Sequence, residues 1–140
     1  MSPSSGSRQL WTPEYWKGYF ESNNPYRRYK LERDRKLAIE LLNPRSGQRI
    51  LEVGCGYGRI SSAILNQAPI QLVGVDLSAG MLEACRQEVK GRFSACRCDS
   101  RQLPFQDETF DAVLCSGVLM HVEDPRAAVG ELCRVLRAGG

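Results

Sequence analysis

The chain has 140 residues, of which 42% are hydrophobic and 25% are charged, and its net charge is +3. This length suits one domain with a real core, and so small a charge gives no support for nucleic acid as a partner. No stretch approaches the ~20 apolar residues of a membrane helix. Residues 1–9 are rich in Ser, Pro and Gly and lack the apolar core of a secretory signal, so we expect a disordered tail there and a cytoplasmic protein.

The chain contains six cysteines and one histidine, His121. No two cysteines form a C-x-x-C pair, and a zinc site would need ligand pairs at tighter spacing, so no metal site is predicted. We expect buried, reduced thiols, as in a cytosolic protein. The cysteines are Cys55, Cys85, Cys96, Cys98, Cys115 and Cys133.

Residues 10–47 are expected to form a helical cap. Residues 10–24 carry two tryptophans, two tyrosines and a phenylalanine, which favour half-buried positions, either in a lid over a ligand or in a cap packed on the sheet. Asn24-Pro25 predicts the start of a helix that runs to about Leu42, where Asn43-Pro44 ends it. Its many basic residues alternate with acids, which favours a solvated face over a patch for an anionic substrate or a membrane surface.

A short apolar run precedes three glycines at alternate positions, in the sequence ILEVGCGYGRI of residues 50–60. The run predicts a strand with one acid, Glu52, near its end, and residues 61–65 predict the helix that follows. Glycine reaches positive φ and lets a loop approach a ligand closely, and the next helix begins with unpaired N–H groups. The arrangement suits a nucleotide-like cofactor; a glycine-rich turn in some other α/β protein is the alternative.

A second apolar run, QLVGVD, ends in Asp76, 22 positions after Gly54. A carboxylate at the end of a second strand can accept hydrogen bonds from ribose hydroxyls, and we expect Asp76 at a strand end open to solvent. Ser78 is a good N-cap for a helix over residues 79–90. This helix would place Met81 beside the expected adenine, although a core contact explains the methionine equally well.

Two further strands are predicted, over Phe93–Cys98 and Phe110–Cys115. The second is nearly continuous in apolar character, which predicts burial on both of its faces. Residues 125–136 have apolar side chains spaced by three to four and therefore predict a helix. Asp124 is its expected N-cap and Gly139 the glycine that ends it.

Strand and helix thus alternate about four times. This pattern predicts βαβ units and a parallel sheet covered on both faces, which is an α/β, Rossmann-like doubly wound fold. The candidate ligand residues all follow strands: the glycine loop, Asp76, Asp99 and the loop from Ser116 to His121. In an open α/β sheet such positions gather at the carboxyl ends of the strands, where ligands bind.

The pattern E-x-G-x-G-x-G departs from the dinucleotide pattern G-x-G-x-x-G, because Arg59 stands where the latter has its third glycine. It resembles motif I of the class I S-adenosylmethionine-dependent methyltransferases. The stretch Asp99–Phe105 resembles the D-x-x-x-L-P-F segment of their small-molecule, type 11-like branch, which includes quinone-biosynthesis enzymes. The final L-x-R-V-L-R-A-G-G resembles their L-K-P-G-G turn, with Ala138 in place of proline. The resemblance covers residues 48–140.

This resemblance implies a domain over residues 48–140 that binds S-adenosylmethionine and transfers its methyl group to a small molecule. Glu52 and the glycine loop would hold the methionine part, Asp76 the ribose, and Asp99 with Ser100 the adenine edge. Ser116 would lie near the sulfonium. The cofactor-binding candidates are Glu52, Gly54, Cys55, Gly56, Gly58, Asp76, Leu77, Met81, Asp99, Ser100 and Ser116.

His121 is the candidate catalytic residue, since histidine exchanges protons near neutral pH. A base is needed only if the acceptor must lose a proton, and a helix-capping or packing histidine is the alternative. Two other functions stay open. One is an oxidoreductase that uses a nicotinamide dinucleotide, and the other is a non-catalytic fragment that binds the cofactor.

The sheet of this family has the strand order 3-2-1-4-5-7-6. The sequence accounts for strands 3-2-1-4, so we expect a C-terminally truncated chain in which the remaining strands are missing. Residues 110–115 would then form an apolar edge with unpaired backbone groups, in which only Asp111 carries a charge. We expect the isolated chain to self-associate through this edge.

Overall fold

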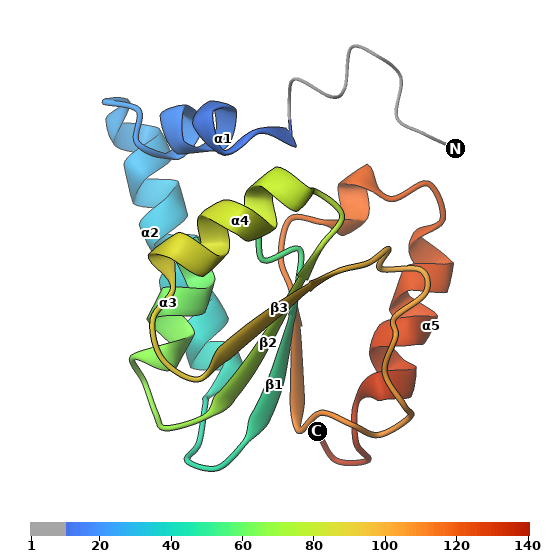
Figure 1. Cartoon of the computed structure of the whole chain (residues 1–140). Coiled ribbons are helices and arrows are strands. Elements are labelled where there is room, and N and C mark those ends of the chain that lie inside the picture. Colours follow the sequence, from blue (N-terminus) through green and yellow to red (C-terminus); the bar gives the residue numbers. More distant parts are fainter. Residues whose placement is uncertain (1–10) are drawn as a thin grey trace.

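The computed structural model describes residues 11–140, so the tail expected over residues 1–9 lies outside the described residues. Two helices, α1 (Pro13–Phe20) and α2 (Pro25–Leu42), precede an alternation of strands and helices (Figure 1). None of the helices within residues 11–140 combines the length and hydrophobicity that a membrane crossing needs. The alternation comprises β1 (Arg49–Val53), α3 (Arg59–Leu65), β2 (Gln71–Asp76), α4 (Ala79–Glu88), β3 (Phe93–Arg97), β4 (Ala112–Cys115), the 3-10 helix η2 (Leu119–His121) and α5 (Pro125–Val135).

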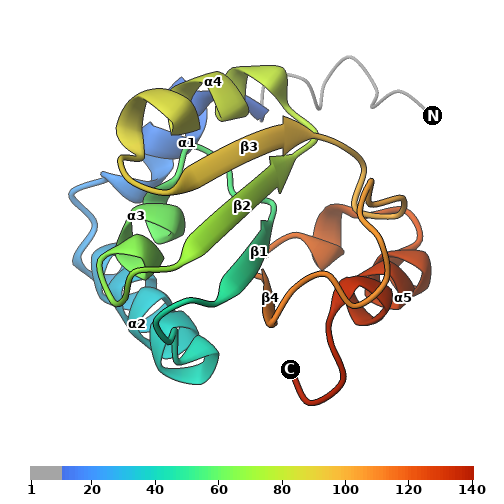
Figure 2. The ribbon, with the colours of Figure 1, turned by 60° about the horizontal axis from the view of Figure 1, so that its bottom comes forward.

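The four strands form one parallel sheet in the order β3-β2-β1-β4 (Figure 2). This order confirms the predicted arrangement 3-2-1-4 and the Rossmann-like α/β fold. β1 is interior: Leu51 pairs with Val73 of β2 on one side and with Val113 of β4 on the other. Within residues 11–140, β4 pairs with β1 alone and is therefore an edge of the sheet.

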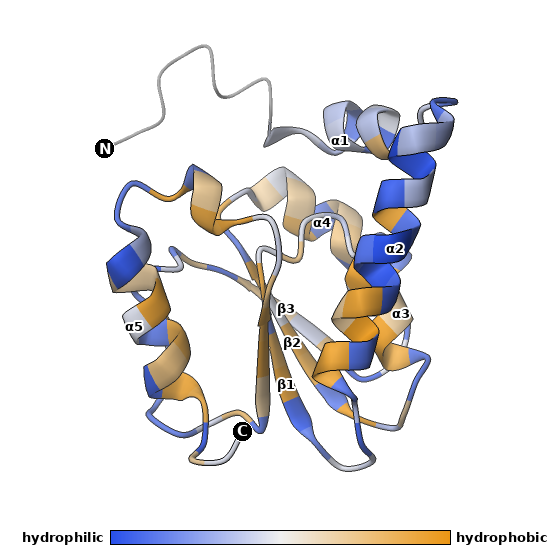
Figure 3. Cartoon of the chain, turned by 180° about the vertical axis from the view of Figure 1, so that it is seen from behind, coloured by the Kyte–Doolittle hydropathy of each residue, from blue (hydrophilic) through white to orange (hydrophobic). Residues whose placement is uncertain are grey.

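Alternate residues of β1 enter two cores on opposite faces of the sheet. Leu51 packs with Phe110 and with Val135 of α5. Ile50 packs with Ile64 of α3, and residues of α2 join the same core. Helices α2, α3 and α4 cover this second face (Figures 1 and 2). Figure 3 shows hydrophobic residues along the strands and the lower half of α2. Each fully buried aliphatic side chain stabilises the folded state by roughly 1.5–3 kcal/mol.

Side chains cap the predicted helix starts. Oxygens of Asn24, Ser78 and Asp124 accept hydrogen bonds from backbone N–H groups in the first turns of α2, α4 and α5, at 3.0, 3.3 and 3.1 Å. Such caps are typically worth ~1 kcal/mol each. Asn43 has a φ of 43° and ends α2. These contacts confirm the predicted starts of the three helices and the predicted end of α2.

Three other limits differ from the prediction by two residues or fewer. α3 begins at Arg59 rather than at residue 61, because Gly58 with φ 93° is already its N-cap. α4 ends at Glu88 rather than at residue 90, and β3 ends at Arg97 rather than at Cys98. Helix and strand ends commonly shift by this amount because their last backbone groups have alternative partners.

The strand predicted over residues 110–115 is shorter and more exposed than expected. Phe110 forms an isolated parallel bridge with Leu136 instead, so β4 begins at Ala112. The four residues of β4 are half-buried. The predicted burial on both faces is wrong because β4 is an edge strand.

The bridge between Phe110 and Leu136 also corrects the end of the last helix. α5 stops at Val135, because Leu136 has extended backbone angles and pairs with Phe110. Gly139 has a φ of 83° but lies in a turn beyond this bridge. Gly139 therefore does not end the helix, so the prediction that it would is wrong.

Candidate functional site

The loop between β1 and α3 is closely packed at its two ends and open in its middle. A Cβ on Gly54 would lie 2.0 Å from Cγ2 of Val118, and a Cβ on Gly58 would lie 2.3 Å from Cγ2 of Val89. A Cβ on Gly56 would meet nothing within 4 Å. The backbone around Gly56 is therefore accessible to a ligand, whereas Gly54 and Gly58 are required by packing.

Asp76, the last residue of β2, anchors this loop. Its Oδ2 accepts a hydrogen bond from the N–H of Gly56 at 3.0 Å, and its Oδ1 accepts one from the N–H of Ser78 at 2.9 Å. Burial raises the pKa of Asp76, while these N–H donors act in the opposite direction. The carboxylate is thus half-buried beneath the loop, and the expectation of a solvent-open position is wrong. The next residue, Leu77, is exposed.

Glu52 lies in the core, where only 3% of its surface is exposed. Ser61, in the first turn of α3, donates a hydrogen bond of 2.5 Å to its Oε2. Burial raises the pKa of Glu52 to about 7, although the hydrogen bond from Ser61 and the charge of Arg59 oppose this shift. Glu52 therefore ties β1 to the first turn of α3, on the far side of the loop, and is close to its own titration point at neutral pH.

Two of the predicted cofactor contacts have their side chains in the core. Cys55 packs with Leu82 and Cys85, and Met81 is also buried, which is the core contact that the sequence left open. A hydrogen bond with Cys85 and burial raise the pKa of the Cys55 thiol. All six cysteines are free thiols. Cys55 and Cys85 are buried as expected, but the other four are not: Cys133 is exposed, and Cys96, Cys98 and Cys115 are half-buried.

Asp99 follows β3 and is already engaged by a neighbouring side chain. The N–H of Cys98 donates to the carbonyl oxygen of Asp76 at 3.2 Å, which brings this segment beside the end of β2. Nη2 of Arg101 donates to Oδ2 of Asp99 at 2.7 Å and lowers the pKa of the carboxyl group. Ser100 between them is half-buried. Sequence reasoning missed Arg101, whose only signal was its place two residues after Asp99.

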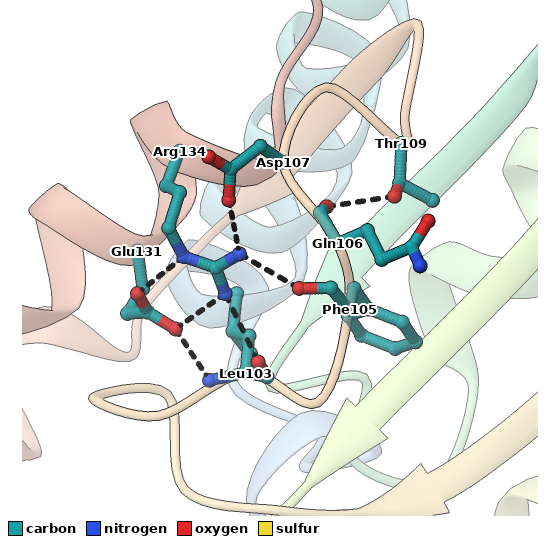
Figure 4. A network of polar contacts seen from close by, with 7 residues as sticks. All are labelled: Leu103, Phe105, Gln106, Asp107, Thr109, Glu131 and Arg134. Carbon is teal, nitrogen blue, oxygen red and sulfur yellow. Dashed lines mark hydrogen bonds and ion pairs between the residues drawn. The ribbon is translucent and has the colours of Figure 1, made fainter.

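Two charged residues of α5 hold the segment that follows Ser100 (Figure 4). Arg134 donates to the carbonyl oxygens of Leu103 and Phe105 at 3.0 and 2.7 Å, and to Asp107 at 2.8 Å. Glu131 accepts from the N–H of Leu103 at 2.7 Å and binds Arg134. The sequence signal for this network was an opposite-charge pair at i, i+3 on a helix. The network positions the loop that carries Asp99.

Helix α1 lies at the end of the molecule toward which the strands point, above α4 and the start of α2 (Figure 1). The ring of Phe20 is 6.1 Å from that of Tyr57 in the glycine loop, and the guanidinium of Arg59 lies 4.8 Å from the Phe20 ring centre. Lys17 binds Glu88 of α4 at 2.9 Å. The aromatic stretch thus contacts the glycine loop, α3 and α4, so it covers the edge where the candidate ligand residues gather.

The loop after β4 brings its residues to the same edge. Val118 lies against Gly54, and Ser116 is exposed. The ring of His121 meets that of Trp11 edge-on, with the centres 4.9 Å apart, and the carbonyl oxygen of Trp11 accepts from Ser78 at 3.1 Å. His121 therefore packs on an aromatic side chain while it remains exposed.

Two open cavities lie away from these residues. One, of about 560 Å³, adjoins the end of α5, and the other, of about 570 Å³, lies between α2 and β4. The second is lined by Leu41, Ala112, Val113 and Leu136 among others, and neither is lined by a predicted cofactor residue. In residues 11–140, no group of three or more His, Cys, Asp or Glu side chains is placed to hold a metal ion.

The chain has known relatives. Residues 51–140 match the model of a family described as a methyltransferase domain. An O-methyltransferase of Pyrenophora dematioidea is 32% identical over 131 residues, which are 87% of this chain and 49% of that protein. A demethylmenaquinone methyltransferase of Clavibacter sepedonicus is 42% identical over 99 residues, which are 69% of this chain and 40% of that protein. The chain thus spans less than half the length of these relatives.

A solved structure agrees with the family match. Phosphoethanolamine N-methyltransferase 2 of Haemonchus contortus, in complex with S-adenosyl-L-methionine, has a TM-score of 0.70 at 26% identity. The similarity covers 77% of this chain and 26% of that one. The family match spans most of the chain, and S-adenosyl-L-methionine is the methyl donor of this family. The chain belongs to the class I S-adenosylmethionine-dependent methyltransferase family.

Proposed function

We propose that this chain binds S-adenosylmethionine at the carboxyl edge of its sheet and takes part in the transfer of the methyl group to a small molecule. The observation that carries the proposal is the hydrogen bond from the N–H of Gly56 to Asp76. It holds the glycine loop after β1 beside the carboxylate that ends β2, which is the pair of elements that a nucleoside-containing ligand uses in such folds.

The residues at this edge fit such a ligand. The space around Gly56 leaves the loop backbone open to close approach. Asp76 binds the N–H groups of Gly56 and Ser78, and a carboxylate has about four acceptor positions, so it keeps capacity for ribose hydroxyls. Asp99 offers a second carboxylate, which can accept from the exocyclic amino group of adenine.

Each part of the ligand would have its own contacts. The methionine part would lie against the glycine loop, which Glu52 supports, and the ribose would lie at Asp76 and Leu77. Asp99 and Ser100 would hold the adenine edge, and Ser116 would lie near the sulfonium. The side chains of Cys55 and Met81 are buried, so we propose that they shape this site from the core.

When bound, S-adenosylmethionine supplies a methyl group that its sulfonium already activates. The chain's own contribution is to position the reactants and to exclude water. We propose that residues 10–47 form a cap for this purpose over a cofactor domain of residues 48–140, with the aromatic face of α1 as the lid. His121, held edge-on by Trp11, would accept a proton from acceptors that must lose one.

Calorimetric titration with S-adenosylhomocysteine and, separately, with NADH tests this proposal. We expect S-adenosylhomocysteine to bind and NADH not to bind. Binding of NADH alone would favour the oxidoreductase alternative. Binding of neither would reject the proposed site. Binding of S-adenosylhomocysteine without methyl transfer to any small-molecule acceptor would leave the non-catalytic alternative.

A substitution at Asp76 tests the ribose contact. Asp76→Asn should weaken binding by about 10- to 150-fold, because a hydrogen bond to a charged group contributes roughly 1.5–3 kcal/mol. Because the carboxylate also anchors the glycine loop, thermal unfolding without ligand must be measured beside it. Asp34→Asn on α2, where Asp34 lies 3.7 Å from Arg33, is the matched control. Unchanged affinity in Asp76→Asn would reject the ribose assignment.

We also propose that the isolated polypeptide self-associates through β4. This strand is an uncharged edge within the described residues and borders the cavity beside α2, and such edges pair readily with other chains. Light scattering should therefore give a mass above that of the monomer, and Val113→Lys should lower it. A monomeric unmodified chain would contradict this.

A further inference from the structure

The carboxylate of Asp99 does not stand free at the end of β3. Nη2 of Arg101 donates to its Oδ2 at 2.7 Å, and Nε lies 3.1 and 3.2 Å from the two oxygens. The backbone N–H of Arg101 also donates to Oδ1, at 2.9 Å. On its other side, Nη1 of Arg101 lies 3.5 Å from Oε2 of Glu123, in the loop after η2. The guanidinium thus joins the loops that follow β3 and β4.

We propose that Arg101 is a positioning residue for adenine recognition: it holds the Asp99 carboxylate in one orientation, so that the acceptor position on Oδ2 that Nε–H only shares receives the exocyclic amino group of the base. The inference rests on the proposed function, in which the adenine of S-adenosylmethionine lies at Asp99. In this role Arg101 does not contact the ligand and affects binding only by orienting Asp99.

The hydrogen-bond count supports this role. A carboxylate has about four acceptor positions, and three N–H groups of Arg101 make four contacts with it, because Nε–H is shared between Oδ1 at 3.1 Å and Oδ2 at 3.2 Å. The N–H of Gln102 donates to the carbonyl oxygen of Asp99 at 3.0 Å, so the backbone at Asp99 is fixed as well. The position on Oδ2 that Nε–H only shares, at 3.2 Å, has the longest of these contacts, and its direction is set by the guanidinium fork. An amino group can bind there without displacing Arg101.

The exposure of the pair decides what the fork contributes. The side chains of Arg101 and Asp99 are 34% and 35% exposed, and ion pairs at such positions add little to folding stability. A bidentate guanidinium–carboxylate pair nevertheless has a fixed geometry that the ammonium of lysine does not impose. The main effect of Arg101 is therefore on the orientation of Asp99, and loss of Arg101 should change ligand selectivity more than stability.

The test compares two ligands that differ only at the base. S-adenosylhomocysteine carries the exocyclic amino group, and S-inosylhomocysteine carries a carbonyl oxygen in its place. We expect the unmodified chain to prefer the adenosyl compound by about tenfold or more. Arg101→Met should abolish most of this preference by lowering the affinity for the adenosyl compound alone. Arg101→Lys should keep part of the preference that Arg101→Met loses.

Two further variants isolate the action through Asp99. The double variant Asp99→Asn, Arg101→Met should bind the adenosyl compound as weakly as Asp99→Asn and no more weakly. Arg92→Met, at the amino end of β3, is the matched control and should retain the full preference. A change that merely disturbs the loop would lower both affinities together and leave their ratio unchanged.

The outcomes separate this inference from the proposed function. If the unmodified chain binds neither compound, the proposed function fails. If the unmodified chain binds the adenosyl compound and Arg101→Met keeps the preference, the positioning role alone is overturned. If Arg101→Met binds the adenosyl compound more tightly than the unmodified chain does, the positioning role is also overturned, because Arg101 then competes with the ligand for Asp99. If Arg101→Met does not fold, the ligand preference is measured in Arg101→Lys and in Asp99→Asn instead. The inference is overturned if both variants keep the preference of the unmodified chain for the adenosyl compound.

Discussion

Neighbouring glycines of the loop after β1 should separate ligand binding from folding. Gly56→Ala adds a methyl group that meets nothing within 4 Å, at a φ of 55°, so its cost is the left-handed backbone, roughly 1–2 kcal/mol. Gly58→Ala adds the same strain and places Cβ 2.3 Å from Val89 and 3.0 Å from Cys85. Overpacking of this kind costs roughly 1–3 kcal/mol more, which gives about 2–5 kcal/mol in total.

Urea unfolding without ligand measures these costs, and calorimetry with S-adenosylhomocysteine measures binding. We expect Gly56→Ala to unfold cooperatively but to lose most of its affinity, because the methyl group occupies the space where the ligand approaches the backbone. Gly58→Ala should lose stability instead. Gly130→Ala in α5, where a Cβ also meets nothing, is the control: it should leave binding unchanged and raise stability slightly, by up to about 1 kcal/mol, because alanine favours a helix over glycine. If Gly56→Ala binds as tightly as the unmodified chain, the ligand does not lie against this loop.

Three other residues give further predictions. Glu52→Gln should become more stable relative to the unmodified chain as the pH rises from about 4.5 to 7. In this range the unfolded chain ionises Glu52 while the folded chain keeps it protonated, so the unmodified chain loses stability and the Gln variant does not. The stability difference should change by about 3 kcal/mol, and a pH-independent difference in urea unfolding would contradict this. Arg134→Met should speed hydrogen exchange in residues 99–107, because Arg134 holds the carbonyl oxygens of that segment, whereas Arg126→Met on the exposed side of α5 should not; equal rates in both would remove the role of Arg134. Cys133 should react with iodoacetamide well before Cys55, which is buried and has a raised pKa, and the reverse order in peptide mapping would contradict the described burial.

The strands and helices were predictable because their signals are local. Apolar runs, the glycines after residue 53 and the caps at Asn24, Ser78 and Asp124 each mark an element without reference to the rest of the chain. Alternation of such elements then leaves few topologies. The order β3-β2-β1-β4 follows from these signals together with the family resemblance.

The side-chain partners within the site were not predictable in the same way. The anchoring of the glycine loop by Asp76 requires the loop to fold back over β2. The engagement of Asp99 by Arg101 depends on a turn whose geometry the sequence does not state. The burial of β4 was overestimated because apolar character alone does not distinguish an interior strand from an edge. Each miss concerns tertiary contacts, and two of the three concern residues of the proposed cofactor site.

The central claim is that the nucleoside of S-adenosylmethionine lies at the carboxyl edge of the sheet. Amide NMR of the chain titrated with S-adenosylhomocysteine tests it most directly. We predict that the largest shifts occur at Gly56, Asp76 and Arg101. Shifts confined to the cavity beside β4, around Leu41 and Ala112, or no shifts at saturating ligand, would contradict the claim.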